Sequence, residues 1–178
     1  MAGSDLLRVV LTGSECTGKT TLAAELARAY GAVAAPEYAR LYLDAKGPPL
    51  TAADVEPIAR GQMAVEDETA AAAQRVLFKD TDLVSTVVYA RQYYGACPAW
   101  IEDAARQRLA DLYLLLAPDV PWRADGARRD RPRSREEIHA LFRDTLLAFG
   151  ARLVEIGGSW AERRSRATEA VDALLRAR

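Results

Sequence analysis

The sequence lacks the residues on which several classes of protein depend. Cysteine occurs only at Cys16 and Cys97, without a CxxC pair, which excludes a disulfide framework and a cysteine-based zinc site. The single histidine, His139, lies within an expected helix, and we interpret it as structural or exposed. No apolar run approaches the ~18 residues of a membrane-spanning helix, and the first residues lack the apolar core of a signal peptide. These absences predict a cytoplasmic protein with no membrane partner.

Neither sign of charge is in excess. The chain has 24 basic and 25 acidic residues, so its charge gives no reason to expect a nucleic-acid partner. Only three of the basic residues are lysines, Lys19, Lys46 and Lys79, which slightly favours a specific need for lysine at each position. The length of 178 residues, against roughly 150 for an average domain, predicts a single domain over residues 1–178.

Short apolar segments alternate with helical patterns along the whole chain. Strands are expected at residues 7–11, 32–35, 75–78, 112–116 and 153–156. Helices are expected at residues 19–30, 37–45, 51–73, 83–94, 98–109, 134–149 and 161–178. This alternation predicts an α/β fold, with a five-stranded parallel sheet and helices on both of its faces.

The segment GSECTGKT, residues 13–20, matches the phosphate-binding pattern GxxxxGK[ST] between the first expected strand and the first helix. Glycine lets the backbone approach a phosphate closely, and the loop N–H groups and helix N-terminus bind its oxygens. Lys19 would neutralise charge on the β- and γ-phosphates, and the Thr20 hydroxyl would ligate Mg²⁺. We interpret Cys16 as a small filler rather than a nucleophile. The predicted ATP-binding residues of this P-loop are Gly13, Ser14, Glu15, Cys16, Thr17, Gly18, Lys19, Thr20 and Thr21.

A P-loop occurs in small-molecule kinases, GTPase switches and AAA-type or motor ATPases. The sequence has no guanine-reading NKxD, and it lacks the long chain and the paired acids before a catalytic Glu that are typical of such ATPases. A kinase needs a basic lid, and six arginines lie between residues 123 and 135. We therefore predict a lid over about residues 121–135, in which Arg128 and Arg131 contact the transferring phosphate while the loop excludes water.

Acidic residues follow two of the expected strands. Glu37 comes after the second strand, and Asp80 and Asp82 come after the third. The carboxyl ends of parallel strands form the ligand-binding edge of a sheet, so all three are expected near the P-loop. We predict that Asp80 orders Mg²⁺ and that Glu37 or Asp82 accepts or orients the proton of the attacking hydroxyl, a choice that the residues leave open. The predicted catalytic residues are Lys19, Glu37, Asp82, Arg128 and Arg131.

A set of segments in fixed order is more specific than the P-loop alone: GSECTGKTTLAAELA, PEYARLYL, IARGQ, DTDLVST, DLYLLLAPDVPWRADGAR and IGGSWAERRSRA. With them the chain resembles the ribosylnicotinamide kinase domain of NadR-type NAD-salvage proteins, within the P-loop kinases. The resemblance implies a nucleoside and nucleotide kinase-like fold and Mg²⁺-dependent transfer of the ATP γ-phosphate to the 5′-hydroxyl of nicotinamide riboside, giving nicotinamide mononucleotide. Larger family members add an adenylyltransferase domain. Nothing in this chain corresponds to it, so a separate adenylyltransferase is expected to act next.

The resemblance also directs attention to residues for the nucleoside. Ribose hydroxyls suit a carboxylate, and the cationic nicotinamide ring suits aromatic faces. Gln62 is a candidate partner for the carboxamide. Trp160 and Arg163 follow the last strand, where related kinases hold adenine, although surface helix positions are an equal alternative for Arg163. The candidate acceptor-binding residues are Glu37, Tyr38, Arg40, Gln62, Asp82, Tyr89, Tyr93 and Trp122, with Tyr94 as a further aromatic candidate.

Two alternatives remain open. The acceptor could be another nucleoside, such as a deoxynucleoside. A nucleotide-sensing regulatory module with little turnover is the alternative from a different class. Weak ATPase activity that no nucleoside accelerates would favour the sensor.

Overall fold

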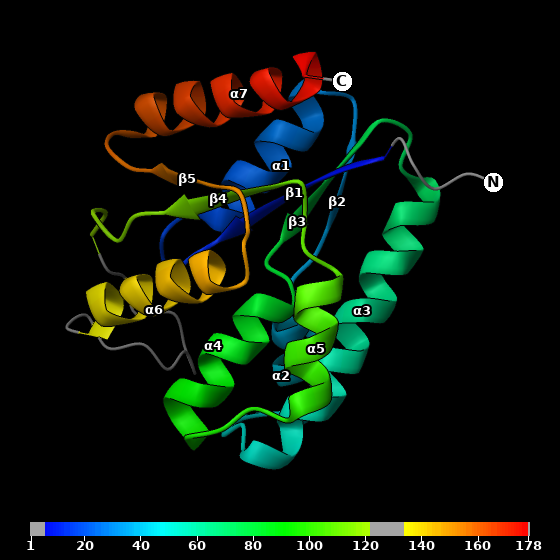
Figure 1. Ribbon diagram of the computed structural model, residues 1–178, viewed down its shortest axis with the longest axis vertical. Helices are drawn as coiled ribbons and strands as arrows, with labels where there is room; N and C mark the ends of the chain where they lie inside the picture. Colours follow the sequence, from blue (N-terminus) through cyan, green and yellow to red (C-terminus); the bar gives the residue numbers. More distant parts are fainter. Residues whose placement is uncertain (1–5, 122–133, 178) are drawn as a thin grey trace.

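The computed structural model describes residues 6–121 and 134–177, in which five strands alternate with helices (Figure 1). In chain order the elements are β1 (Leu7–Thr12), α1 (Lys19–Ala29), β2 (Val33–Ala35), α2 (Tyr38–Lys46), η1 (Ala52–Asp54), α3 (Val55–Ala72), β3 (Val76–Asp80), α4 (Leu83–Tyr94), α5 (Ala99–Gln107), β4 (Leu112–Leu116), α6 (Arg135–Ala148), β5 (Leu153–Ile156) and α7 (Trp160–Arg176).

The strands form one sheet in the order β2-β3-β1-β4-β5, and every neighbouring pair is parallel. In the centre, Val9 of β1 pairs with Phe78 of β3 on one side and with Leu112 of β4 on the other. Strands β3 and β4 are buried along their whole length, as expected when helices cover both faces of a parallel sheet. The predicted α/β class with a five-stranded parallel sheet is confirmed.

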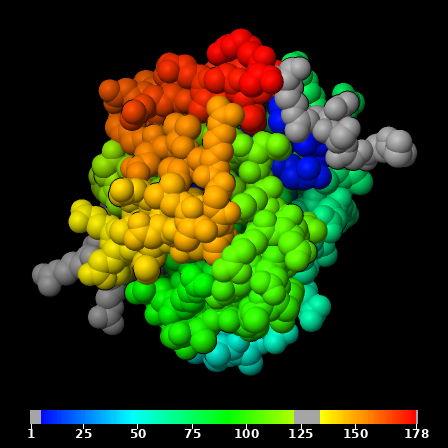
Figure 2. Space-filling view, viewed as in Figure 1, coloured from blue at the N-terminus to red at the C-terminus, as the bar shows by residue number. Residues whose placement is uncertain are grey.

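Helices lie on both faces of the sheet (Figure 1). On one face, α1 and α7 contribute Leu22 and Val171 to a core that includes Phe78. On the other, α3 to α6 pack on Tyr113 and Leu115 of β4. The space-filling view shows α4, α5 and α6 covering much of this second face (Figure 2). This arrangement leaves the loops at the carboxyl ends of the strands free to form a site.

Most elements lie within one or two residues of their expected bounds, and two differences bear on the site. The third strand ends at Asp80 rather than at residue 78, because Lys79 and Asp80 continue the pairing with Val10 and Leu11 of β1. The helix expected at residues 51–73 is divided into η1 and α3, and its start carries the capping box of Thr51 and Asp54. In the described part of the chain, no helix has the length and apolar character needed to cross a membrane.

Candidate functional site

The glycines of the P-loop are held in conformations and spaces that other residues do not fit. Gly13 has φ 131°, and a Cβ there would lie 2.7 Å from the carbonyl oxygen of Leu116. Gly18, with φ 89°, caps α1, and a Cβ there would lie 2.8 Å from the Trp160 ring. Cys16 also has a positive φ of 56°. The loop therefore turns its backbone N–H groups and the start of α1 toward one concavity, which is an anion-binding arrangement.

Lys19 lies over this loop. Its Nζ donates a hydrogen bond to the carbonyl oxygen of Ser14 at 2.7 Å, and the Thr17 hydroxyl donates to the same oxygen at 2.9 Å. Glu15 to Thr21 line a cleft beside the loop, whereas Gly13 and Ser14 are not among its lining residues. The ammonium is thus placed where a phosphate bound to the loop N–H groups would meet it.

Thr20 and Asp80 bring two side-chain oxygens together at the carboxyl-terminal end of β3. The Thr20 hydroxyl donates to Asp80 Oδ2 at 2.5 Å, and Asp80 is only 4% exposed. Asp80 Oδ1 is buried and has no hydrogen-bond partner among the described residues. A buried carboxylate with an unused oxygen beside a hydroxyl fits Mg²⁺, a hard cation that prefers oxygen and often takes one or two protein ligands beside phosphates and water. These residues therefore fit the predicted magnesium site.

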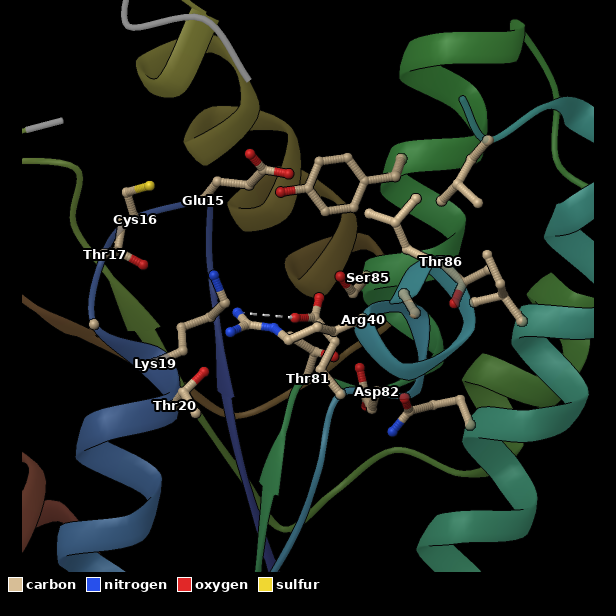
Figure 3. Close-up of a pocket in the computed structure, with 18 of the residues that line it drawn as sticks. Glu15, Cys16, Thr17, Lys19, Thr20, Arg40, Thr81, Asp82, Ser85 and Thr86 are labelled. Carbon is tan, nitrogen blue, oxygen red and sulfur yellow. Dashed lines mark ion pairs between the residues drawn. The ribbon is translucent and has the colours of Figure 1, made fainter. Parts of the chain in front are cut away.

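A single cleft of about 860 Å³ joins the P-loop to α2, α3 and α4 (Figure 3). Figure 3 shows Cys16, Thr17, Lys19 and Thr20 on one side of the cleft and Ser85 and Thr86 on the other. The volume lies within the usual range of roughly 300–1,000 Å³ for small-molecule sites. The sequence-predicted residues that line the cleft are Glu15, Cys16, Thr17, Gly18, Lys19, Thr20, Thr21, Glu37, Arg40, Gln62, Asp82, Tyr89, Tyr94 and Trp160.

Asp82 is a buried carboxylate at the start of α4. Its Oδ1 accepts from the Val84 N–H at 3.0 Å, and its Oδ2 accepts from the Tyr113 hydroxyl at 2.6 Å. Burial, with a smaller contribution from the Glu66 carboxylate, raises the pKa of Asp82 to about 6, although Lys79 and the hydrogen bonds from Tyr113 and Val84 act to lower it. Asp82 is thus fixed in direction, and both of its oxygens already accept hydrogen bonds.

Glu37 lies on a different wall of the cleft. It precedes the first residue of α2, and its side chain is 24% exposed. Its Oε2 lies 3.7 Å from the Arg40 guanidinium, the ion pair drawn in Figure 3. Of the two carboxylates that were candidates for the proton-accepting role, Glu37 is therefore the more accessible from the cleft.

The wall of the cleft away from the P-loop is mainly apolar, and sequence analysis missed most of it. Tyr89 lines the cleft as predicted, while Tyr93 is not among the lining residues and stacks on Tyr89 with ring centroids 5.8 Å apart. The missed residues come from several helices and loops, where each resembles an ordinary core or surface position. They are Ala39, Leu43, Leu50, Thr51, Val55, Ile58, Thr81, Ser85, Thr86, Ala90 and Val120.

Two predicted acceptor-binding residues, Tyr38 and Gln62, contact each other. Tyr38 is not among the residues that line the cleft, and its N–H donates to Gln62 Oε1 at 2.9 Å. Gln62 is 3% exposed, and its Nε2 donates to Glu66 at 3.0 Å. Both ends of the Gln62 amide thus have protein partners.

Arg163 does not lie on the surface, which was one of the two expectations for it. Its side chain is fully buried, and its guanidinium donates to the carbonyl oxygens of Thr17, Ala117 and Gly158 and pairs with Asp119. Stacking on adenine, the other expectation, needs an exposed guanidinium face, and Arg163 is fully buried and not among the residues that line the cleft. The structure instead ties Arg163 to the P-loop through Thr17.

Trp160 packs against Gly18 and lines the cleft, and its Nε1 donates to Glu25 at 3.3 Å. It therefore lies beside the P-loop, on the side where adenine was expected. The predicted lid residues Arg128 and Arg131 and the predicted acceptor contact Trp122 lie outside the described residues.

Residues 8–163 match the family described as AAA domain. The chain belongs to this family. The trifunctional NAD biosynthesis/regulator protein NadR of Salmonella typhimurium is 33% identical over 124 residues, which are 67% of this chain and 30% of that protein. NadR of Escherichia coli matches to the same extent. The chain thus spans less than a third of the length of these curated relatives, and the predicted resemblance to NadR is confirmed.

Solved structures agree with this relationship. A crystal structure of NadR in complex with NR has a TM-score of 0.80 and 29% identity, covering 96% of this chain and 52% of that one. NadR in complex with NAD and AMP-PNP has a TM-score of 0.76 and 26% identity, covering 96% of this chain and 50% of that one. Thymidylate kinase from Ehrlichia chaffeensis has a TM-score of 0.66 at 14% identity, covering 96% of this chain and all of that one, which shows the fold alone. Although the family carries the AAA name, which sequence analysis set aside as an ATPase class, the fold resembles P-loop nucleotide kinases, as predicted.

Proposed function

We propose that this chain transfers the γ-phosphate of ATP to the 5′-hydroxyl of nicotinamide riboside, with Mg²⁺ as the metal. The observation that carries the proposal is one cleft that joins a P-loop to two carboxylates and an apolar wall. The likeness to NadR in complex with NR, over 96% of the chain, supports nicotinamide riboside as the acceptor. The likeness to NadR with NAD and AMP-PNP supports an adenine nucleotide as the donor.

The residues take distinct roles in this proposal. The P-loop N–H groups and Lys19 bind the triphosphate, and Thr20 with Asp80 would hold Mg²⁺, which offsets phosphate charge when bound. Glu37 accepts the proton of the attacking hydroxyl, because it is the more accessible of the two carboxylates. Asp82 accepts hydrogen bonds from the ribose hydroxyls, because its direction is already fixed by Tyr113 and the start of α4.

The direct test measures ADP release with MgATP and a panel of nucleosides. Nicotinamide riboside should accelerate ADP release above all others and should yield the mononucleotide. Acceleration by a deoxynucleoside alone would identify a different acceptor. ATP hydrolysis that no nucleoside accelerates would favour a nucleotide sensor.

Two substitutions test the assigned chemistry, and one serves as a control. Lys19→Ala should abolish transfer, because it removes the cation that lies over the P-loop. Glu37→Gln should reduce kcat by roughly 10²–10⁴-fold if the carboxylate accepts the proton. Glu68→Gln, which changes an exposed carboxylate of α3 outside the cleft, should leave kcat unchanged. A normal kcat for Glu37→Gln would move the base elsewhere.

Several finer points stay predictions. These are a single domain over residues 1–178, phosphate contacts from Arg128 and Arg131, a cytoplasmic location, and a separate adenylyltransferase that consumes the product.

A further inference from the structure

Two sequence motifs, IARGQ and PEYAR, form one unit in the structure. The first lies on α3 and the second at the start of α2, and their contacts centre on Tyr38. The proposed function uses Glu37 from this region. It does not explain why Gly61 and Gln62 follow one another opposite Tyr38.

Gly61 makes room for the Tyr38 ring. A Cβ on Gly61 would lie 1.9 Å from Tyr38 Cε1 and 2.2 Å from Cζ, far inside contact distance. Gly61 has no positive φ, so close approach rather than backbone conformation accounts for the glycine. Glycine inside a helix costs about 1 kcal/mol relative to alanine. The glycine is needed here because the Tyr38 ring lies directly on the backbone of α3.

Gln62 holds the backbone of Tyr38. The Tyr38 N–H, at the first position of α2, has no acceptor within its own helix, and Gln62 Oε1 accepts it. Glu66 orients the amide by accepting from Gln62 Nε2, so the amide oxygen faces Tyr38. Glu66 Oε2 in turn accepts from Lys79 at 2.7 Å, a pair that is almost fully buried. Because Lys79 precedes Asp80 on β3, three hydrogen bonds link the start of α2 to the strand that carries the predicted magnesium ligand.

We propose that Gly61 and Gln62 are positioning residues, which seat Tyr38 so that the neighbouring Glu37 faces the P-loop across the cleft. This inference rests on the proposed function and deepens it. Glu37 is the residue immediately before Tyr38, and its Oε2 lies 3.7 Å from the guanidinium of Arg40, which belongs to the first turn of α2. The direction of its carboxylate therefore depends on how the first turn of α2 is held. Tyr38 and Gln62, predicted from sequence to contact the nucleoside, act instead through Glu37.

The first test is Gly61→Ala, assayed by MgATP-dependent phosphorylation of nicotinamide riboside. The new methyl group should displace the Tyr38 ring and lower kcat by about 10- to 100-fold, because small displacements of a reacting group carry penalties of that order. The KM for MgATP should stay within about twofold, because the P-loop is untouched. Thermal stability should not fall in proportion to kcat, because alanine favours the helix by about 1 kcal/mol.

A double-mutant cycle isolates the contact. In a Tyr38→Ala background the ring is gone, so adding Gly61→Ala should cause no further loss of kcat. Gln62→Leu should also lower kcat, because it removes the acceptor of the Tyr38 N–H. Thr69→Val is the matched control, since it deletes a hydrogen bond to Val65 on the same helix without touching Tyr38, and it should leave kcat unchanged.

The inference is overturned if Gly61→Ala keeps a kcat within twofold of wild type, or if its effect persists undiminished without the Tyr38 ring. A change in Gln62→Leu confined to the KM for the nucleoside would also overturn it, because that pattern indicates a direct substrate contact. If the wild-type protein phosphorylates no nucleoside, the proposed function fails. The contacts of Gly61 and Gln62 with Tyr38 are then tested by hydrogen exchange at the Tyr38 amide, which should be faster in Gly61→Ala and Gln62→Leu. Unchanged exchange would show that these contacts do not hold Tyr38 in place.

Discussion

Replacing Arg163 with methionine should destabilise the fold and loosen the P-loop. The Arg163 side chain is fully buried, and its three nitrogens donate to carbonyl oxygens of three separate segments, at 2.9 Å for Gly158, 3.0 Å for Ala117 and 3.1 Å for Thr17. The guanidinium also pairs with Asp119. Methionine fills a similar volume but donates no hydrogen bond.

The size of the loss follows from the surroundings of each acceptor. A hydrogen bond from a charged group contributes about 1.5–3 kcal/mol when its partner is left without a replacement. Thr17 is buried, whereas Gly158 and Asp119 are exposed, so water can replace the guanidinium at the latter two. The lost bond to Thr17 and partial losses at the other acceptors together lower the free energy of unfolding by about 3–4 kcal/mol. For a domain of this size, that corresponds to a fall in Tm of roughly 10 °C.

Urea unfolding measures this difference, with Arg164→Met as the matched control. Arg164 is the next residue, but its side chain is 57% exposed and lies 4.0 Å from Glu25. A pair of this kind contributes about 0–1 kcal/mol, so the control should unfold close to wild type. The affinity for MgATP should fall in Arg163→Met and not in Arg164→Met, because only Arg163 holds the Thr17 carbonyl. If Arg163→Met unfolds within about 1 kcal/mol of wild type, water replaces the guanidinium at every acceptor and the reasoning is wrong.

Two further predictions concern carboxylates. Asp80→Asn should raise by at least about tenfold the Mg²⁺ concentration needed for ATP to stabilise the protein, because it weakens the oxygen pair with Thr20. An unchanged Mg²⁺ midpoint in thermal-shift titrations would place the ion elsewhere. For Asp54, the hydrogen bond from Lys46 holds the pKa of the carboxyl well below its usual range, with help from Thr51. The ionised form is therefore favoured by folding, so its stabilisation is complete above the unfolded pKa of about 4 and is lost as the pH falls below that value. The difference in Tm between wild type and Asp54→Asn should shrink between about pH 5 and pH 3, and a constant difference would contradict the pairing.

Sequence patterns predicted the fold well where burial leaves an apolar signature. The strand at residues 112–116 was placed at its observed bounds because both of its sides are buried in apolar cores. The end of β3 was missed because Lys79 and Asp80 interrupt the apolar run. Their charges are accommodated by Glu66 and Thr20, which are distant in the sequence, so no local pattern marks them as strand residues.

The site could be predicted only where its chemistry constrains the local sequence. Close approach of the backbone requires Gly13 and Gly18, so the P-loop is recognisable from sequence alone. The apolar wall carries no such mark, because a helix face on a cleft has the same pattern as one in the core. The burial of Arg163 was equally hidden, since its acceptors at Thr17 and Ala117 lie 146 and 46 residues away in the chain.

The three lysines share one kind of contact in this structure. Each of the three lysines directs its ammonium at one short oxygen contact: Lys19 at Ser14 (2.7 Å), Lys46 at Asp54 (2.6 Å) and Lys79 at Glu66 (2.7 Å). The other oxygen of Glu66 accepts from Gln62, so the Lys79 ammonium meets one oxygen of this carboxylate. A compact ammonium on a flexible stem suits such sites, whereas a guanidinium suits acceptors that are spread in a plane. Arg163, with acceptors in four residues, is the opposite case, because its guanidinium reaches oxygens that a single ammonium would not span.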